Sequence, residues 1–212
     1  FDINNPTAQY IQISLSFETS EDKIRVQLPS WRPGRYELGN FAKNLKNFKI
    51  YGDKNKVLTF AKISKDCWEI KTDNCKEIRV EYQYYATDLN AGSTYLDAKQ
   101  LYVNPVNCCA YVLGRENDNI EVKLNVPSSY QIACGLKHEN QVLKANNFDE
   151  LADSPFICSA SLQHETYHVN ETLFHIWFQG EVKVNWEKIL NDFTAFTTKQ
   201  IEKFSEFPVP EY

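Results

Sequence analysis

Apolar and polar residues alternate along most of the first 180 residues, and this period of two limits the possible folds more than any other feature of the sequence. The clearest runs cover residues 11–17, 24–28, 78–84, 120–126 and 156–162. Turn-forming residues separate the runs, at 51–53, 73–74, 127–129 and 138–140. Strands with one apolar and one polar face are typical of antiparallel sheets with one solvated face. Many short strands of this kind predict a mainly β fold, an antiparallel sandwich or saddle.

The periodicity changes near Gly180. Apolar residues then recur at helical spacing, at Trp186, Ile189, Leu190, Phe193, Phe196, Ile201 and Phe204. Asn185 is suited to cap the start of this helix. The apolar stripe is wide, so we expect the helix to pack on another part of the protein. We therefore expect an N-terminal β-domain over 1–165, and linking strands with the first helix of an incomplete second domain over 166–212.

Residues 28–48 form a second distinctive segment. Pro33-Gly34 predicts a turn, because Gly takes a positive φ at no steric cost. We expect Trp31 and Tyr36 to be buried side chains that plug a corner. Three apolar residues follow at helical spacing, Phe41, Leu45 and Phe48.

The same segment carries a family resemblance. Trp31-Arg32-Pro33-Gly34-Arg35-Tyr36, followed by Phe41-Ala42, resembles the N-terminal domain of the glycyl aminopeptidases, family sixty-one of the metallopeptidases. Similar segments follow in order along nearly the whole chain, at Trp68 with Ile70, 80–88, 95–97, 102–105, 148–155, 175–180 and 207–212.

The resemblance implies a parent enzyme with an N-terminal β-domain, a thermolysin-like domain that contains an H-E-x-x-H motif, and often a PDZ-like module. The motif would lie beyond Tyr212, so we expect no catalytic residue, no cofactor and no activity in this chain alone. In the parent, zinc-activated water would attack the first peptide bond with a Glu as general base. The implied substrates are peptides that begin with Gly or Ala, and the implied partners are the chain's own downstream catalytic domain and the peptide.

The chain nevertheless contains an H-E-x-x-H match, His164-Glu165-Thr166-Tyr167-His168, and Glu187 follows at a spacing that zinc aminopeptidases use for a third ligand. On a helix, His164 and His168 would share one face and could bind one zinc ion, with Glu165 as the base. The surrounding alternation and the β-branched residues favour a strand instead. On a strand, residues four apart are separated by about 13 Å, too far for zinc bonds of about 2 Å. We expect no metal site here, and expect Glu187 in the first turn of the helix.

The loop from Asn90 to Asn107 offers a substrate-binding role. In thermolysin-like aminopeptidases a β-domain packs over the cleft and helps to capture the free amine of the substrate. The candidate residues here are Tyr95, Asp97, Asn104 and Asn107. Asp97 could attract an ammonium group by its charge, and the alternative is that these residues cap turns.

The net charge of −5 and the absence of a basic run make nucleic acid an unexpected partner. No apolar stretch approaches the eighteen residues of a membrane span, so a membrane is not expected either. The chain begins at Phe1 and contains no Met, which fits removal of a signal peptide or a fragment of a longer protein. The implied parent is of bacterial type, and the sequence leaves a periplasmic, secreted or cytoplasmic location open.

Six cysteines lie between Cys67 and Cys158, without a C-x-x-C pair. We expect free, half-buried thiols, with a Cys67–Cys75 bridge as the alternative. Two other functions remain open: a stand-alone β-sandwich module that binds a glycan or a peptide through its many aromatic residues, and a self-contained zinc enzyme that uses His164, His168 and Glu187.

Overall fold

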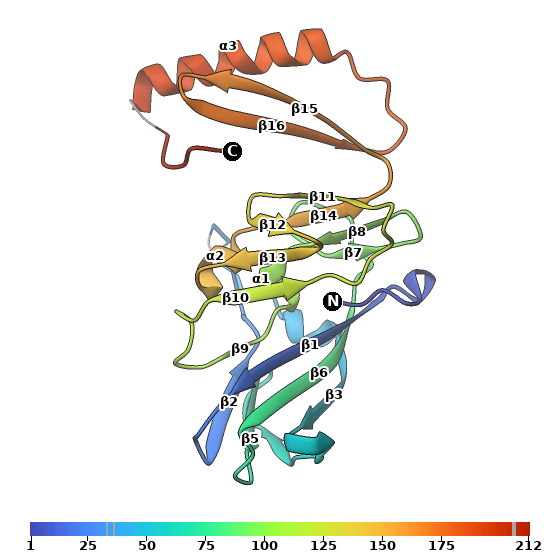
Figure 1. Ribbon diagram of the computed structural model, residues 1–212, viewed down its shortest axis with the longest axis vertical. Coiled ribbons are helices and arrows are strands. Elements are labelled where there is room, and N and C mark those ends of the chain that lie inside the picture. The colour runs from blue at the N-terminus through green and yellow to red at the C-terminus, as the bar shows by residue number, and fades with distance from the viewer. Residues whose placement is uncertain (33, 36, 205–206) are drawn as a thin grey trace.

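Short antiparallel strands are the main elements of the structure, as the alternation predicts (Figure 1). The structure is a computed structural model that describes residues 1–32, 34–35, 37–204 and 207–212. The strands of its first half are β1 (Tyr10–Glu18), β2 (Lys23–Gln27), β3 (Leu45–Tyr51), β4 (Phe60–Lys62), β5 (Cys67–Lys71), β6 (Glu77–Tyr85), β7 (Tyr95–Leu96), β8 (Gln100–Val103) and β9 (Tyr111–Val112). The remaining strands are β10 (Ile120–Lys123), β11 (Gln131–Cys134), β12 (Lys137–Glu139), β13 (Val142–Ala145), β14 (Phe156–Ser159), β15 (Leu162–Val169) and β16 (Thr172–Gln179).

Two sheets form a sandwich at the end of the molecule remote from the C-terminus. One sheet has the order β1-β6-β3 and the other the order β4-β5-β2-β9. Their inner faces meet where Phe48 of β3 stacks on Trp68 of β5, with ring centroids 4.4 Å apart. On the first sheet, Arg79 lies over the ring of Tyr51 and its Nε is 2.8 Å from Glu81 Oε1.

Two further sheets continue the β-domain toward the C-terminal part of the molecule (Figure 1). Their strand orders are β10-β13-β12 and β11-β14-β8-β7. Two short helices lie among these strands, α1 (Pro105–Cys108) and α2 (Phe148–Ala152). Asn147 begins α2, because its Oδ1 accepts the Glu150 backbone N–H at 2.8 Å. Three short 3-10 turns, η1 (Pro6–Ala8), η2 (Phe41–Asn44) and η3 (Asp53–Asn55), complete the β-domain.

One hydrophobic core joins these sheets and extends from Ile3 to Cys158. Tyr82 lies at its centre and is fully buried. Its hydroxyl donates to the Cys108 carbonyl at 2.7 Å and accepts the Ala110 N–H at 3.0 Å, so the ring both fills the core and satisfies two backbone groups. All six cysteines are free, and every one except the half-buried Cys134 is buried. The alternative of a Cys67–Cys75 bridge is therefore wrong.

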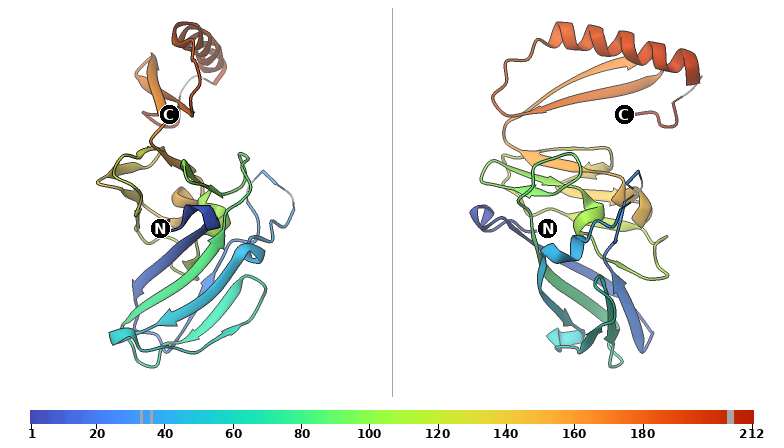
Figure 2. Two further views of the ribbon diagram at one scale, coloured as in Figure 1. Left: turned by 90° about the vertical axis from the view of Figure 1, so that its right-hand side faces the viewer. Right: turned by 180° about the vertical axis from the view of Figure 1, so that it is seen from behind.

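A separate unit follows the β-domain, as the views in Figures 1 and 2 show. It consists of the hairpin β15–β16 and the helix α3 (Trp186–Phe204) packed on one face of that hairpin. It has its own small cluster of buried residues, Val169, Phe174 and Ile201. β15 runs without a break through residues 165 and 166, so the change from one core to the other falls between β14 and β15. The domain limits at 165 and 166 stay a prediction.

Several local expectations are wrong. Phe41, Leu45 and Phe48 do not share a helix, because η2 is short and β3 begins at Leu45, where it pairs with β6. His138 and Glu139 lie in β12 instead of a turn, and the turn falls on Asn140 and Gln141, both with positive φ.

Trp31 is 49% exposed and does not plug a corner, because the loop around it pairs with no strand within the described residues. Pro33 of the expected turn and Tyr36, the second expected plug, lie outside the described residues. Among the described helices, none combines the length and the hydropathy that a membrane span needs.

Candidate functional site

The H-E-x-x-H match lies on β15, where the chain is extended. His164, Glu165 and His168 pair across the hairpin with Trp177, Ile176 and Leu173 of β16. At about 3.3 Å per residue, the two imidazoles stand roughly 13 Å apart along the strand. The prediction of a strand at this segment is confirmed.

His164 meets a different set of side chains from the one that the motif suggests. Its ring stacks on Trp177 at a centroid distance of 3.8 Å, and its Nε2 lies 2.8 Å from Nδ1 of His175. His175 Nε2 in turn lies 2.7 Å from Glu211 Oε1, at ion-pair distance but without the geometry of a hydrogen bond. Burial, and then the neighbouring His175, lower the pKa of His164.

Glu187, the expected third member of that motif, lies in the first turn of α3 as predicted. The helix begins at Asn185, whose Oδ1 accepts the Lys188 backbone N–H at 3.1 Å. Across the described residues, no group of three or more His, Cys, Asp or Glu side chains converges as a metal site would require.

Two of the four predicted substrate-binding residues form the β7–β8 hairpin. Asp97 Oδ1 accepts the backbone N–H groups of Lys99 and Gln100 at 2.7 and 2.9 Å, and Asp97 Oδ2 accepts the Tyr95 hydroxyl at 3.2 Å. Both side chains are half-buried, so part of each faces solvent. Burial, and then the Asp97 carboxylate, raise the pKa of Tyr95. Asp97 thus organises the turn and still presents a carboxylate at the surface.

Asn104 and Asn107 lie inside the β-domain and not at its surface. Both are buried. Their Nδ2 groups donate to the carbonyls of Ala91 and Gly92 at 3.2 and 2.9 Å. They therefore fix the loop that precedes β7, and Asn107 Oδ1 finds no hydrogen-bond partner among the described residues.

The same loop contacts the segment around Trp31. A Cβ placed at Gly92 would lie 2.4 Å from Arg32 Nη2, so a larger residue at this position would require the guanidinium to shift. Tyr102 lies nearby, and its hydroxyl donates to the Ala91 carbonyl at 3.1 Å. Sequence reasoning placed Arg32 in the family motif without a structural role, and the close approach to Gly92 gives it one.

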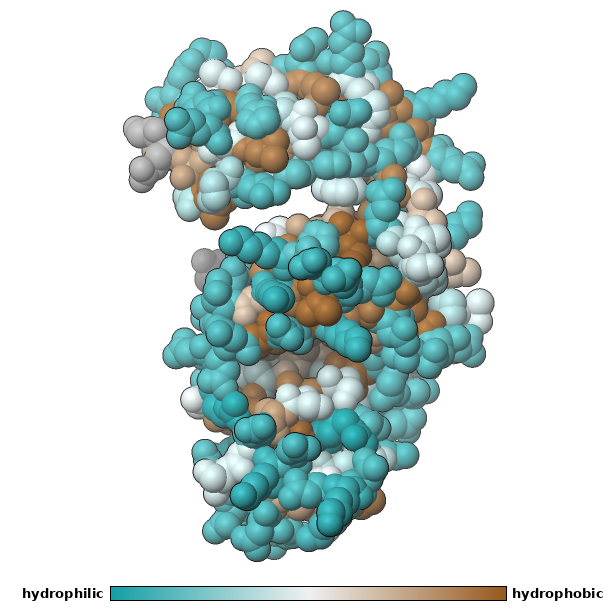
Figure 3. Space-filling model, in the orientation of Figure 1, coloured by the Kyte–Doolittle hydropathy of each residue, from teal (hydrophilic) through white to brown (hydrophobic). Residues whose placement is uncertain are grey.

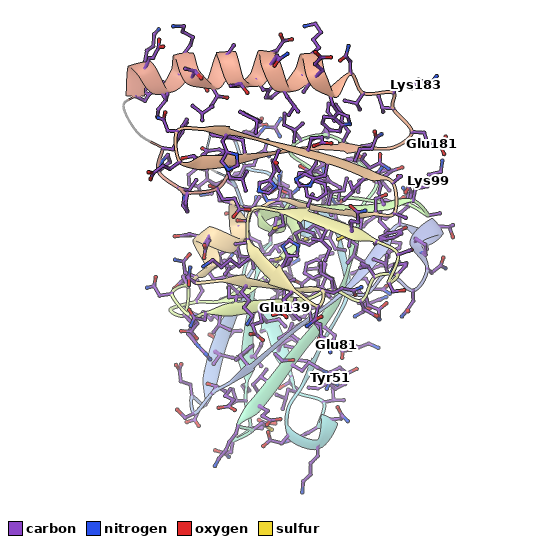
Figure 4. All side chains as sticks on the ribbon, turned by 45° about the horizontal axis from the view of Figure 1, so that its top comes forward. Tyr51, Glu81, Lys99, Glu139, Glu181 and Lys183 are labelled. Atoms are coloured by element: carbon purple, nitrogen blue, oxygen red, sulfur yellow. The ribbon has the colours of Figure 1, made fainter. Side chains whose placement is uncertain are left out.

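The β7–β8 turn and the linker before α3 lie at the same edge of the molecule, where Lys99, Glu181 and Lys183 project (Figure 4). Beyond this edge, α3 turns part of its apolar stripe toward solvent: Phe196 is 56% exposed and Phe204 74%. These two residues, with Tyr167 and Phe174 of the hairpin and others, line a groove of about 460 Å³. We refer to it as the α3 groove.

Comparison with known families places residues 1–160 in one of them. These residues match the family model described as the Peptidase M61 N-terminal domain. The chain belongs to this family. The match ends at the point where the structure passes from β14 to β15, so it covers the β-domain and its single core. The predicted resemblance and the predicted fold class are confirmed.

A solved structure supports the same assignment over a longer stretch. An aminopeptidase N family protein from Idiomarina loihiensis matches 99% of this chain with 26% identity and a TM-score of 0.91. The chain spans 37% of the length of that protein. No curated protein matches the chain. The chain is thus a peptidase-associated N-terminal region, and the likeness includes the hairpin and α3 as well as the β-domain.

Proposed function

We propose that this chain is the non-catalytic N-terminal region of a zinc-dependent aminopeptidase that releases Gly or Ala from the start of peptides, and that it packs on and shapes the substrate cleft. The family match and the aminopeptidase name of the solved relative support this assignment. In the parent enzyme the zinc ion would come from the downstream domain. His164, Glu165, His168 and Glu187 have no part in the proposed chemistry, because the first three lie along a strand and the fourth lies on α3.

The α3 groove is the observation that carries the proposal. The hairpin and α3 bury only a small cluster of their own, and they leave Phe193, Phe196 and Phe204 substantially exposed. A helix with a wide apolar stripe is stable in water when that stripe packs on another surface. A downstream catalytic domain would cover the groove and would use this unit as its first element.

The β7–β8 hairpin is the part that we assign to the substrate. Asp97 carries a negative charge near the surface, and its contact with Tyr95 fixes the direction of the carboxylate. In this proposal Asp97 attracts the ammonium group of the peptide. Asn104 and Asn107 support the hairpin from behind through the carbonyls of Ala91 and Gly92.

The first experiment compares this chain with the longer protein that continues past Tyr212. We expect the 212 residues alone to bind no zinc in a metal assay and to leave Gly- and Ala-p-nitroanilide intact, and we expect the longer protein to hydrolyse both. One tightly bound zinc per chain in the 212 residues would refute the proposal. Binding of glycans by the isolated chain would support the binding-module alternative instead.

The second experiment tests Asp97 in the longer protein. Asp97→Asn keeps an oxygen that can accept the Lys99 and Gln100 N–H groups and removes the charge. We expect KM for Gly-p-nitroanilide to rise about tenfold, since a charge-assisted contact contributes about 1.5–3 kcal/mol. Glu139→Gln, an exposed acid on β12, is the matched control and should leave KM unchanged. Equal KM values in the two variants would exclude the amine-binding role.

A further inference from the structure

Two sheet edges face each other across an open slot in the β-domain. Within the described part of the chain, β1 pairs along its length with β6 alone, and β10 pairs with β13 alone. Between the free edges of β1 and β10 lies a hollow of about 950 Å³, lined on one side by residues 12–17 and on the other by 118–125. Figure 3 shows this hollow in the face of the molecule. We refer to it as the β1–β10 slot.

The first residues of the chain show how a strand fits between these edges. The backbone groups of Asp2 and Gln12 donate to each other at 2.9 Å in both directions, so this segment runs antiparallel to β1. On the other side, Asn125 N donates to the Phe1 carbonyl and Phe1 N donates to the Lys123 carbonyl, both at 2.8 Å, in a parallel ladder with β10. The segment is therefore hydrogen-bonded to both edges.

Backbone groups continue both ladders into the slot. In an antiparallel pair, alternate residues point both their N–H and C=O groups to the same side. Ser14 and Ser16 therefore point theirs the same way as Gln12, into the slot. By the same alternation, the backbone groups of Glu121 on the edge of β10 point into the slot, like those of Lys123 and Asn125. Phe1 and Asp2 show that one strand can bond to β10 and to β1 at alternate residues.

The floor of the slot is apolar and only partly covered. Tyr82 and Phe148 of the main core lie beneath it. Leu15, Phe17 and Ile120 pack against that core and are left half-buried. Free sheet edges beside an open apolar floor are a binding site for a strand.

We propose that the β1–β10 slot binds one extended polypeptide segment as a β-strand, and that this segment is polypeptide joined directly to Phe1. The strand runs antiparallel to β1 and parallel to β10. It joins the sheets β1-β6-β3 and β10-β13-β12 into one continuous sheet. A joined segment is favoured over a separate peptide because Phe1 already holds the register, and a linked ligand binds at high effective concentration.

The register fixes which residues of the segment face the core. Phe1 packs on the core with its ring 6.0 Å from that of Phe156, and Ile3 is buried, whereas the Asp2 carboxylate accepts the Asn125 side-chain N–H at 3.0 Å. Since side chains alternate along a strand, the second and fourth residues before Phe1 point inward and should be apolar. The first and third point outward and bond to Ser14 and Ser16.

The test adds five residues before Phe1 in the order Thr-Val-Thr-Val-Thr, which places both valines inward. We expect Tm to rise by at least about 5 °C, from the two buried valines and the added ladder. We also expect amide hydrogen exchange at Ser14, Ser16, Glu121 and Lys123 to slow by about tenfold or more, because these residues become interior to a sheet.

The matched control is the extension Val-Thr-Val-Thr-Val, which has more apolar residues but turns them outward. It should give less than half of the rise in Tm and little protection. Equal effects of the two extensions, or no protection from the first, would overturn the proposal. Equal protection from free Thr-Val-Thr-Val-Thr peptide at 1 mM would overturn the claim of a joined segment. None of these measurements depends on peptidase activity, so the outcome is independent of the proposed function.

Discussion

The β-domain and the hairpin–helix unit solve the problem of burying apolar surface in different ways. The β-domain folds its sheets around one core that extends from Ile3 to Cys158 and includes fully buried rings such as Tyr82 and Phe156. The hairpin–helix unit buries Val169, Phe174 and Ile201 and leaves the α3 groove open. The first region has the larger core, whereas the second has a small core and leaves part of the apolar stripe of α3 exposed.

The two regions therefore differ in how much apolar surface they bury. Net stability is a small difference between large terms, and a small core rarely exceeds the entropy cost of ordering the chain. We therefore expect the β-domain to unfold cooperatively, and the hairpin–helix unit to open at lower denaturant concentration. The predictions below test this difference, from the largest expected effect to the smallest.

Phe156→Ala should destabilise the β-domain by about 3–5 kcal/mol, because it leaves a cavity in a site that is 1% exposed. Phe174→Ala should cost about 1–3 kcal/mol, because Phe174 lies beside the α3 groove and water can enter the space. Urea unfolding followed by far-UV circular dichroism should show the first loss in the later transition and the second in the earlier one. A single transition in both variants would show that the two regions unfold together.

Tyr82→Phe should cost about 1–3 kcal/mol, although the ring stays, because the Cys108 carbonyl and the Ala110 N–H lose their buried partner. Tyr130→Phe is the control, since the Tyr130 hydroxyl donates to the Ala98 carbonyl at an exposed site. Its free energy of unfolding should fall by no more than about 0.5 kcal/mol. A similar loss in the two variants would contradict the assigned role of Tyr82.

Asn185→Ala should destabilise the hairpin–helix unit alone by about 1 kcal/mol, because the first turn of α3 loses the acceptor for the Lys188 N–H. Asn147→Ala removes the same kind of cap from α2 and should act on the β-domain alone. Amide hydrogen exchange in α3 and in the β-domain separates the two effects. Faster exchange in both regions from either variant would indicate that they are coupled.

The hairpin–helix unit should also lose stability in acid through His164. Its pKa is lowered in the folded state, so as pH falls below about 6.5 the unfolded chain takes up the proton first and unfolding becomes easier. The groups that face His164 are His175, Glu165 and, through His175, Glu211. His164→Gln should flatten this dependence between pH 7 and pH 5 in the earlier transition. His138→Gln, in the β-domain, should leave it unchanged.

The strands with strict alternation were predictable because their pattern depends on one buried face and little else. β1 and β6 follow that pattern almost residue by residue, and α3 with its cap at Asn185 follows from helical spacing. The predicted run over 156–162 was interrupted, since a turn at Ala160 and Ser161 separates β14 from β15. β3 escaped prediction because Phe41, Leu45 and Phe48 fall by chance at helical spacing while pairing with β6 decides the structure.

The candidate site was only partly predictable for a similar reason. The extended form of the H-E-x-x-H segment followed from its local residues. The depth of Asn104 and Asn107 and the contact of Arg32 with Gly92 depend on segments far apart in the sequence. The stack of His164 on Trp177 required the register of β15 and β16, which the sequence alone does not specify.

All of the thiols lie on one side of the division between the two regions, from Cys67 to Cys158. Burial raises the pKa of the Cys158 thiol to about 12 and raises that of Cys108 as well, so both react slowly with alkylating reagents while the core is closed. Labelling of these two thiols therefore requires the core to open. The rate at which Cys108 and Cys158 take up a thiol reagent reports the opening of the β-domain and does not respond to fraying of the hairpin and α3.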